Sequence, residues 1–302
     1  MSLNPQALTL LVPFPPGGST GFTAEILGER LASVLERPVG IDTRTGDLGS
    51  NAVRALMEGP EDRVFLVGNI NASSVAPVVQ RGRMSIDHWS VVQPVTRLAE
   101  FPSVVCTHGA FPADTLRDFL AHLKRTTGQI RYGTDFLGTY VDVDVLRLST
   151  AADLGRSCLT TDGAMGILAD LVAGRTDLAM LNVATATANA ARLKPLAISG
   201  PDRLSNVPDV PTLDEDGFAG VGTSNWQGLL ASRRATPETV AALYGAAVEA
   251  MRDPGTMRRF AEIDARVATS ASPEQFEREI KAEAAQWEEY RDAILHTPLL
   301  QR

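Results

Sequence analysis

The chain has 302 residues, of which 44% are apolar and 21% charged, and its formal net charge is −8. This length suits about two domains, each large enough to bury a core without disulfides. No apolar run approaches the roughly 18 residues that span a bilayer, which disfavours a membrane span. No basic stripe with interleaved aromatic residues is present, which disfavours a nucleic acid partner.

Short apolar runs alternate with longer amphipathic stretches, which is typical of an α/β fold with mostly parallel sheets and flanking helices. The predicted strands are 8–12, 39–42, 64–68, 91–96, 103–107, 130–134, 157–160, 178–182, 195–199 and 226–232. The predicted helices are 20–35, 51–58, 116–124, 140–151, 163–173, 237–252 and 273–295. So many short strands favour more than one sheet. Residues 200–223, rich in Pro, Gly and Asp, are expected to form either a functional loop or a connector.

The first residues, MSLNPQALTL, lack the basic start and the long apolar core of a signal peptide. A first strand at 8–12 explains the apolar character of these residues better than a targeting signal does. Because MSL resembles an added start, we expect that an export signal has been removed ahead of it.

The stretch LLVPFPPGGSTGF, residues 11–23, follows a predicted strand and precedes a predicted helix. Backbone N–H groups and the helix dipole therefore converge at this loop and favour an anion. Gly17 and Gly18 would let a ligand approach the backbone closely, and Ser19 and Thr20 could cap the helix or bind the ligand. The loop matches neither a phosphate-binding GxxxxGK[ST] motif nor GxGxxG, which disfavours a nucleotide. Alone, it could equally be a plain β-α turn.

Further polar loops follow other predicted strands. VGNINASS, residues 67–74, brings Asn69, Asn71 and Ala72 to what should be the same edge of the first sheet, where open α/β sheets bind ligands. YGTDFLGTYVD, residues 132–142, again joins a strand to a helix, here one beginning near Thr139. Asp162 and Gly163 precede another helix, and Asn182 follows a strand. Two helix N-termini facing one cleft could hold the two ends of a small dicarboxylate.

Catalytic and metal-binding signals are weak. The histidines at 88, 108, 122 and 296 have no metal or triad spacing and are interpreted as structural or surface residues. Asp135 and Asp142 could form a carboxylate pair, although both also suit turn and cap positions. Neither GxSxG nor HExxH occurs, so no metal or cofactor is expected.

Cys106 and Cys158 lie far apart, without CxxC or His-linked spacing. The simplest interpretation is two small buried apolar residues. A disulfide is the alternative, and the pair alone does not fix the cellular compartment.

Several segments, by their order and spacing, resemble the Bug-type extracytoplasmic solute-binding proteins of tripartite tricarboxylate transporters (TctC-like), over nearly the whole chain. They are VPFPPGGSTG at 12–21, RTGDLGS at 44–50, DLVAGRTDLAML at 170–181, PLAIS at 195–199 with VPDVPTLDEDGF at 207–218, and WQGLLAS at 226–232. The resemblance implies a two-lobed periplasmic binding protein of type II, closing like a flytrap. Residues 1–101 and 225–302 would form lobe 1 and 102–224 lobe 2, with the ligand cleft between them and hinge strands near 102–107 and 221–228.

The resemblance also implies a function. The protein would be a periplasmic, non-enzymatic and monomeric receptor that captures a small carboxylate and delivers it to membrane transporter subunits. Carried over residue by residue, ligand binding falls to Phe14, Gly18, Ser19, Thr20, Asn69, Asn71, Ala72, Gly138, Thr139, Tyr140, Asp162, Gly163 and Asn182.

The sequence departs from the family pattern at several of these loops. Gly21 stands where the family often has Asp, TRTGDLG replaces an Asn-Arg-Pro-Gly pattern, Asp142 falls near a usual His, and TTDG replaces a Tyr-Lys-Gly-Gly-like stretch. Asp135 and Asp162 would repel a second carboxylate unless they bind an amine or a cation. The ligand could therefore carry an amino group or be a monocarboxylate, or the chain could be a divergent member.

Two other functions remain open from the sequence. The same cleft would serve a sensory binding module that signals to a membrane regulator. A two-lobed α/β enzyme using Asp135 or Asp142 as a base on a bound acid is the third interpretation, although no nucleophile or cofactor motif supports it.

Overall fold

The computed structural model describes residues 6–161 and 163–301. The chain divides into two compact units: unit 1 comprises Met1–Phe101 and Trp226–Glu288, and unit 2 comprises Pro102–Asn225 and Glu289–Arg302. The segment after Glu288, expected in the first lobe, therefore belongs with unit 2. The cause is main-chain pairing, since the Cys158 N–H donates to the Pro298 carbonyl over 2.9 Å and the Leu300 N–H donates to the Cys158 carbonyl over 2.7 Å.

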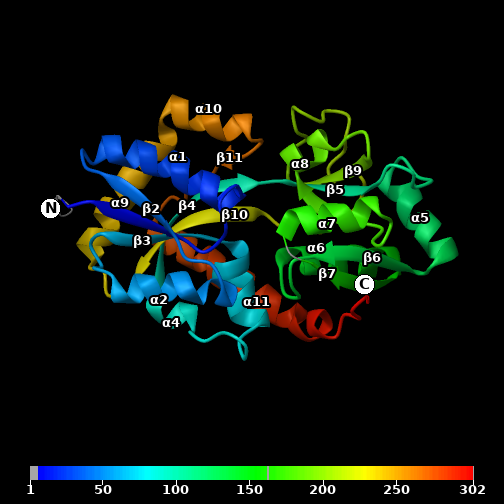
Figure 1. Cartoon of the computed structure of the whole chain (residues 1–302), viewed down its shortest axis with the longest axis horizontal. Helices are drawn as coiled ribbons and strands as arrows, with labels where there is room; N and C mark the ends of the chain where they lie inside the picture. The colour runs from blue at the N-terminus through cyan, green and yellow to red at the C-terminus, as the bar shows by residue number, and fades with distance from the viewer. Residues whose placement is uncertain (1–5, 162, 302) are drawn as a thin grey trace. The chain divides into compact units, whose positions relative to one another are not determined.

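Unit 1 is built on one six-stranded sheet with the strand order β11-β4-β10-β3-β1-β2 (Figure 1). The strands are β1 (Leu8–Val12), β2 (Val39–Thr43), β3 (Val64–Asn69), β4 (Val92–Phe101), β10 (Asn225–Ser232) and β11 (Arg266–Val267). β1 runs parallel to β2 and β3, whereas β10 is antiparallel to β3 and β11 to β4. β10 enters this sheet when the chain returns from unit 2, not through a β-α-β crossover, so it need not be parallel.

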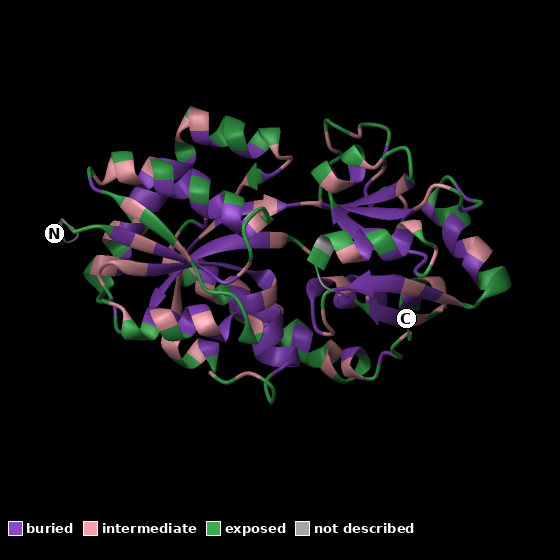
Figure 2. Ribbon diagram, in the orientation of Figure 1, coloured by how far each residue is buried: buried purple, intermediate pink, exposed green. Residues whose placement is uncertain are grey.

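The helical segments of unit 1 are α1 (Ser19–Val34), η1 (Asp47–Gly49), α2 (Ser50–Glu58), η2 (Asn71–Val75, a π-helical turn), α3 (Ala76–Val79), α4 (His88–Val91), α9 (Pro237–Arg252), α10 (Pro254–Glu262) and most of α11 (Pro273–Leu295). α1 presents Ala24, Leu27 and Leu31 to the sheet at helical spacing. They share one hydrophobic core with Leu243 of α9 and Phe260 of α10, and buried residues line the inner strands β1, β3 and β10 of this sheet (Figure 2).

Unit 2 has an antiparallel sheet, β8-β5-β9, and a parallel pair, β6-β7. Its strands are β5 (Ser103–His108), β6 (Gln129–Thr134), β7 (Gly155–Thr160), β8 (Ala179–Asn182) and β9 (Leu193–Ser199), and its helices are α5 (Leu116–Thr126), α6 (Tyr140–Ala152), α7 (Gly163–Val172) and α8 (Val183–Ala188). A single bridge from Tyr132 to Leu178 links the two sheets. The α/β organisation is as expected, but parallel pairing does not dominate as predicted: the sheet of unit 1 is mixed, β8-β5-β9 is antiparallel, and β6-β7 is parallel.

Both cysteines are free and buried, in separate hydrophobic clusters of unit 2. Burial raises the pKa of Cys106 and of Cys158 to about 12, so both thiols stay protonated and unreactive. They act as small apolar core residues, and the disulfide alternative does not apply.

Two further properties hold for the described part of the chain. None of its helices is long and apolar enough to cross a membrane. Residues 6–161 and 163–301 also contain no cluster of three or more His, Cys, Asp or Glu side chains that could hold a metal ion.

Candidate functional site

The loop after β1 ends at the N-terminus of α1, a helix of 16 residues. Gly18 is its N-cap, with extended backbone (φ −95°, ψ 172°), and no described side chain caps the helix or places an acid in its first turn. The first backbone N–H groups of a helix have no intrahelical acceptor, and the helix dipole leaves partial positive charge there. The exposed Gly18 thus marks a helix start that is electrostatically suited to an anion.

A buried side-chain network ties this helix start to two strands. The Thr20 hydroxyl donates to Gln227 Oε1 over 2.7 Å and accepts from Asn69 Nδ2 over 3.3 Å. Gln227 Nε2 in turn donates to the Ser19 hydroxyl over 3.3 Å. Gln227 of β10 faces Asn69 of β3 in the antiparallel register, which explains why these amides meet. The network fixes the orientation of the polar groups at the start of α1.

Asn69 also organises the π-helical turn η2. Its Oδ1 accepts a hydrogen bond from the Ala72 N–H over 3.0 Å, so one amide holds both α1 and η2. The approach of η2 to β3 requires glycine at 68, because a Cβ there would lie 2.4 Å from Ser73 Oγ and 2.7 Å from Leu230 Cδ1. Of the predicted residues in this loop, Asn69 and Ala72 are nearly buried and Asn71 is half-buried.

His88 joins η2 to the start of α2. Its Nδ1 lies 2.9 Å from the Ala72 carbonyl, and its Nε2 lies 3.1 Å from the Ser50 hydroxyl. Because a carbonyl only accepts, Nδ1 carries the proton and Nε2 accepts from Ser50. Burial lowers the pKa of His88, which favours this neutral form. The histidine is structural, as expected from its spacing.

The residues between β2 and α2 have strained backbone beside this histidine. Gly46, Asp47, Leu48 and Gly49 all have positive φ, at 99°, 51°, 52° and 93°. Left-handed conformations cost about 1 kcal/mol or more at non-glycine residues. A Cβ at Gly49 would lie 3.1 Å from Ala72 Cβ, which places this strained turn against the η2 loop.

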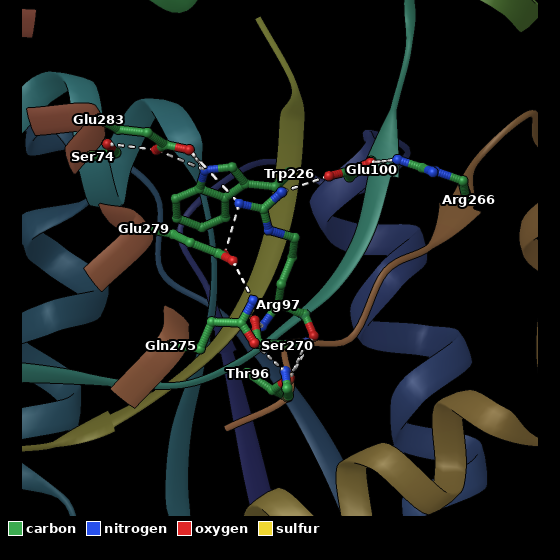
Figure 3. A network of polar contacts seen from close by, with 11 residues as sticks. Ser74, Thr96, Arg97, Glu100, Trp226, Arg266, Ser270, Gln275, Glu279 and Glu283 are labelled. Carbon is green, nitrogen blue, oxygen red and sulfur yellow. Dashed lines mark hydrogen bonds and ion pairs between the residues drawn. The ribbon is translucent and has the colours of Figure 1, made fainter. Parts of the chain in front are cut away.

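A second network holds η2 from the side of α11 (Figure 3). The Ser74 hydroxyl donates to Glu283 over 3.0 Å and accepts from Trp287 Nε1 over 2.8 Å. Trp226 Nε1 also donates to Glu283, at 3.0 and 3.1 Å from its two carboxylate oxygens. Burial raises the pKa of Glu283, opposed by the hydrogen bond from Trp226 and by the charge of Arg97. The η2 turn is thus fixed on both sides.

In unit 2, the predicted loop between β6 and α6 is closed by its own carboxylate. Asp142 Oδ2 accepts from the Gly138 N–H over 2.9 Å, the Thr139 N–H over 2.7 Å and the Thr139 hydroxyl over 2.9 Å. Its Oδ1 accepts from the Tyr132 hydroxyl over 2.6 Å. Thr139 and Asp142 form a capping box, and Gly138 supplies the left-handed turn at φ 99°. These donors therefore serve an internal acceptor.

The Tyr140 hydroxyl lies 2.9 Å from the Ser103 hydroxyl, and Ser103 pairs with Asn182 across β5 and β8. Burial raises the pKa of Tyr140 to about 12, so its phenol is neutral. Asn182 is exposed and caps α8, its Oδ1 accepting from the Thr185 N–H over 2.7 Å. Ser103 thus contacts Tyr140 through its hydroxyl and pairs with Asn182 through its backbone, while the Asn182 side chain serves α8.

The predicted residues fall into separate groups. Ser19, Thr20, Asn69 and Ala72 share one network of unit 1, while Phe14 and Gly18 lie in the loop before it. In unit 2, Gly138 and Thr139 meet at Asp142, and Gly163 begins α7 in exposed, left-handed conformation (φ 70°). Asp162 lies outside the described residues. Sequence reasoning did not assign Gln227 or Ser103 to the site, although both lie in the predicted hinge segments.

Two α/β units with polar loops at strand ends are an organisation that this chain shares with periplasmic solute-binding proteins of solved structure. Comparison with protein families identifies the particular group, because the profile described as "Tripartite tricarboxylate transporter family receptor" matches residues 24–294. The chain belongs to this family, whose members are periplasmic solute-binding receptors and not enzymes.

Individual relatives agree with this assignment. Protein BugT of Bordetella pertussis is 26% identical over 289 residues, covering 93% of this chain and 87% of that protein. A solved structure described as a periplasmic transporter is 26% identical, with a TM-score of 0.82 and coverage of 97% of this chain and 98% of that one. Rpa4515 of R. palustris, solved with adipate, is 24% identical and has a TM-score of 0.84, with coverage of 98% and 99%.

Proposed function

We propose that this protein captures a small carboxylate in the periplasm and delivers it, as a monomer, to the membrane subunits of a tripartite transporter. Membership of the receptor family supports this role, and a similar solved structure, Rpa4515 of R. palustris, holds adipate, a small carboxylate. In this proposal ligand binding shifts the population of the receptor toward its ligand-binding conformation.

The single observation that carries the proposal is the open start of α1. Gly18 and Ser19 begin a helix without a side-chain cap or an acid in its first turn, so its first N–H groups suit a ligand carboxylate. The network of Thr20, Asn69 and Gln227 holds this helix start in place before any ligand arrives. A protein of net charge −8 needs such oriented local donors to bind an anion.

Asp142 does not suit the alternative role of a catalytic base. Both of its oxygens accept hydrogen bonds, and its side chain is buried within the capping box of α6. A base must reach the proton that it removes, which an enclosed capping group does not do.

A thermal-shift screen tests the proposal directly. The panel contains mono-, di- and tricarboxylates, amino acids and aromatic acids. A ligand at 100 times its Kd stabilises the folded state by about 2.7 kcal/mol, which raises the melting temperature measurably. An acid that stabilises the wild type but not a Gly18→Val variant would support binding at α1. Absence of any shift across the panel would refute the carboxylate-receptor function.

A further inference from the structure

Unit 1 contains a cavity of about 90 Å³ that is separate from the side-chain network at the start of α1. Every described residue that lines it belongs to unit 1, and neither Thr20 nor Gln227 is among them. Much of its wall is formed by buried apolar residues of α2, of the adjacent strands β3, β10 and β4, and of α11. These residues are Val53, Leu66, Leu230, Val92 and Ile280.

Water gains little from entering this cavity. A water molecule needs about 10–15 Å³ and two to four polar partners, so the cavity has room for several waters. The apolar wall offers them few hydrogen bonds. His88 also lines the cavity, but both of its ring nitrogens are already bonded, to the Ala72 carbonyl and the Ser50 hydroxyl. An apolar ligand group that displaced such water would therefore bind favourably.

The polar part of the wall is held in place by hydrogen bonds. Trp89 and Ser73 both line the cavity, and Trp89 Nε1 donates to the Ser73 carbonyl over 3.1 Å. The Trp89 carbonyl accepts from Arg233 Nε over 2.8 Å, and the Trp89 N–H donates to Asp87 Oδ1 over 3.1 Å. A preformed site loses less conformational freedom when a ligand binds. An aromatic residue in such a wall also favours a ligand with an aromatic ring.

The exposed part of the wall carries net positive charge. Arg233 and Lys281 have side chains that are 42% and 71% exposed, and both lie beside one carboxylate, Glu277. Glu277 Oε1 is 3.5 Å from Arg233 Nη2 and 3.1 Å from Lys281 Nζ. The hydrogen bond from Lys281 and the charges of Lys281 and Arg233 lower the pKa of Glu277, so this group is ionised. Among the described lining residues two cations thus share one acid, in a protein whose net charge is −8.

We infer that this cavity is a second binding site, for a small organic anion with an aromatic ring, whose charged group lies beside Arg233 and Lys281. The ring would occupy the apolar part of the cavity and displace water from it. A neutral ring of the same shape would lack the ionic contacts, and a cationic one would meet an excess of like charge. The inference does not depend on the proposed function, because no residue of the Thr20, Asn69 and Gln227 network lines this cavity.

Benzoate, benzamide and benzylamine test the inference, since they share one ring and differ in charge. The full-length protein is labelled with ¹³C in the methyl groups of Ile, Leu and Val and titrated with each compound by NMR. Benzoate should shift the methyl signals of the five apolar wall residues, and its ring protons should show nuclear Overhauser effects to them. At these methyls we expect benzoate to bind several-fold more tightly than benzamide, and benzylamine to bind most weakly.

The variant Lys281→Met tests the charged part of the site. Methionine keeps an unbranched apolar stem and removes one of the two cations, so the affinity for benzoate should fall by up to about fivefold, the range of a partly exposed ion pair. The affinity for benzamide should not change. Lys124→Met is the matched control, because Lys124 is also an exposed helical lysine paired with a carboxylate, at 3.0 Å from Asp153. It should leave both affinities unchanged.

The position of the affected methyl groups separates this site from any other carboxylate site. Benzoate that binds elsewhere, without contacts to the five wall residues, would overturn the inference and leave the receptor function intact. Benzamide or benzylamine binding in the cavity as tightly as benzoate would overturn the assignment of an anion. An equal loss of affinity in Lys281→Met and Lys124→Met would overturn the role of Lys281. The comparison of the three compounds uses the wild type, so it stands whether or not a variant folds.

Discussion

The hydroxyl of Thr20 donates to the side-chain carbonyl of Gln227 over 2.7 Å, although 207 residues separate them in the chain. Thr20 belongs to the first β-α loop and Gln227 to the strand that follows the return from unit 2. This buried bond means that the polar groups at the start of α1 are arranged only once both parts of unit 1 have come together.

Replacing Thr20 by valine should weaken ligand binding and lower stability. Valine keeps the shape but removes the hydroxyl, which leaves Gln227 Oε1 and Asn69 Nδ2 each without one partner. An unsatisfied buried polar group costs about 1–3 kcal/mol. Urea unfolding measures the stability and calorimetry measures the Kd. Thr20→Ser, which keeps the hydroxyl, should restore both, and wild-type affinity in Thr20→Val would contradict a role for this network.

Replacing Gly18 by valine should abolish ligand binding without unfolding the protein. Gly18 has φ −95°, which any residue adopts, and a Cβ there would approach only the Pro15 carbonyl, at 4.0 Å. The branched side chain would instead cover the exposed start of α1. We expect a melting temperature near that of the wild type together with no thermal shift from the ligand.

Gly17→Ala should lower stability more than ligand affinity, which is the reverse of the effects expected for Gly18→Val. Gly17 has φ 86°, and a Cβ added there would meet nothing within 4 Å, so alanine should cost about 1 kcal/mol through backbone strain alone. Its ligand affinity should fall less than that of Gly18→Val. Equal affinity losses in the two variants would argue that the loop conformation, and not access to α1, controls binding.

Thr139→Ala should destabilise the protein by about 1 kcal/mol, the usual cost of losing an N-cap side chain. The hydroxyl of Thr139 is part of the capping box and bonds to Asp142. Thr139→Ser keeps this hydroxyl and should retain most of the stability, as measured by urea unfolding. Stability equal to the wild type in Thr139→Ala would show that the capping box contributes little.

Asp144 should make stability fall as the pH rises from about 4 to about 7. Burial raises the pKa of Asp144 from 3.8 to about 7, opposed by hydrogen bonds from Thr223. In this window the unfolded chain has released the proton while the folded protein still holds it, so increasing pH favours unfolding. Asp144→Asn removes this dependence.

The measurement compares the free energy of unfolding of the wild type and Asp144→Asn at about pH 4.5 and about pH 7.5. The wild type should lose stability relative to the variant by more than about 1 kcal/mol across this interval. A difference between wild type and Asp144→Asn that does not vary with pH would contradict the assignment.

Much of the fold could be predicted because local patterns determine its elements. All ten predicted strands are present, and long helices such as α9 and α11 have the expected limits, Pro237–Arg252 and Pro273–Leu295. The two-residue strand β11, the four-residue helices α3 and α4, the six-residue helix α8 and the nine-residue helix α10 were not predicted. All but α10 contain too few residues for a periodicity to emerge, and tertiary contacts determine them.

The candidate site was predictable as loops but not as contacts. The polar groups after β1, β3 and β6 follow from strand-loop-helix patterns, whereas Gln227 meets Asn69 only through the register of β10 on β3, which sequence does not specify. The role of Asp142 had a local signal, since Thr139 and Asp142 have the spacing of a capping box. The structure shows that the cap role, one of the two considered for this residue, is the one it performs.

The interleaving of the two units along the chain also sets an order of biosynthesis. Unit 1 needs Trp226–Glu288, and unit 2 needs Glu289–Arg302, whose Leu300 N–H completes the pairing with Cys158. Domains generally fold as units during translation, but here neither unit is complete until residues after Asn225 have left the ribosome. The nascent chain therefore holds the first part of each unit before the segment that completes it has been made.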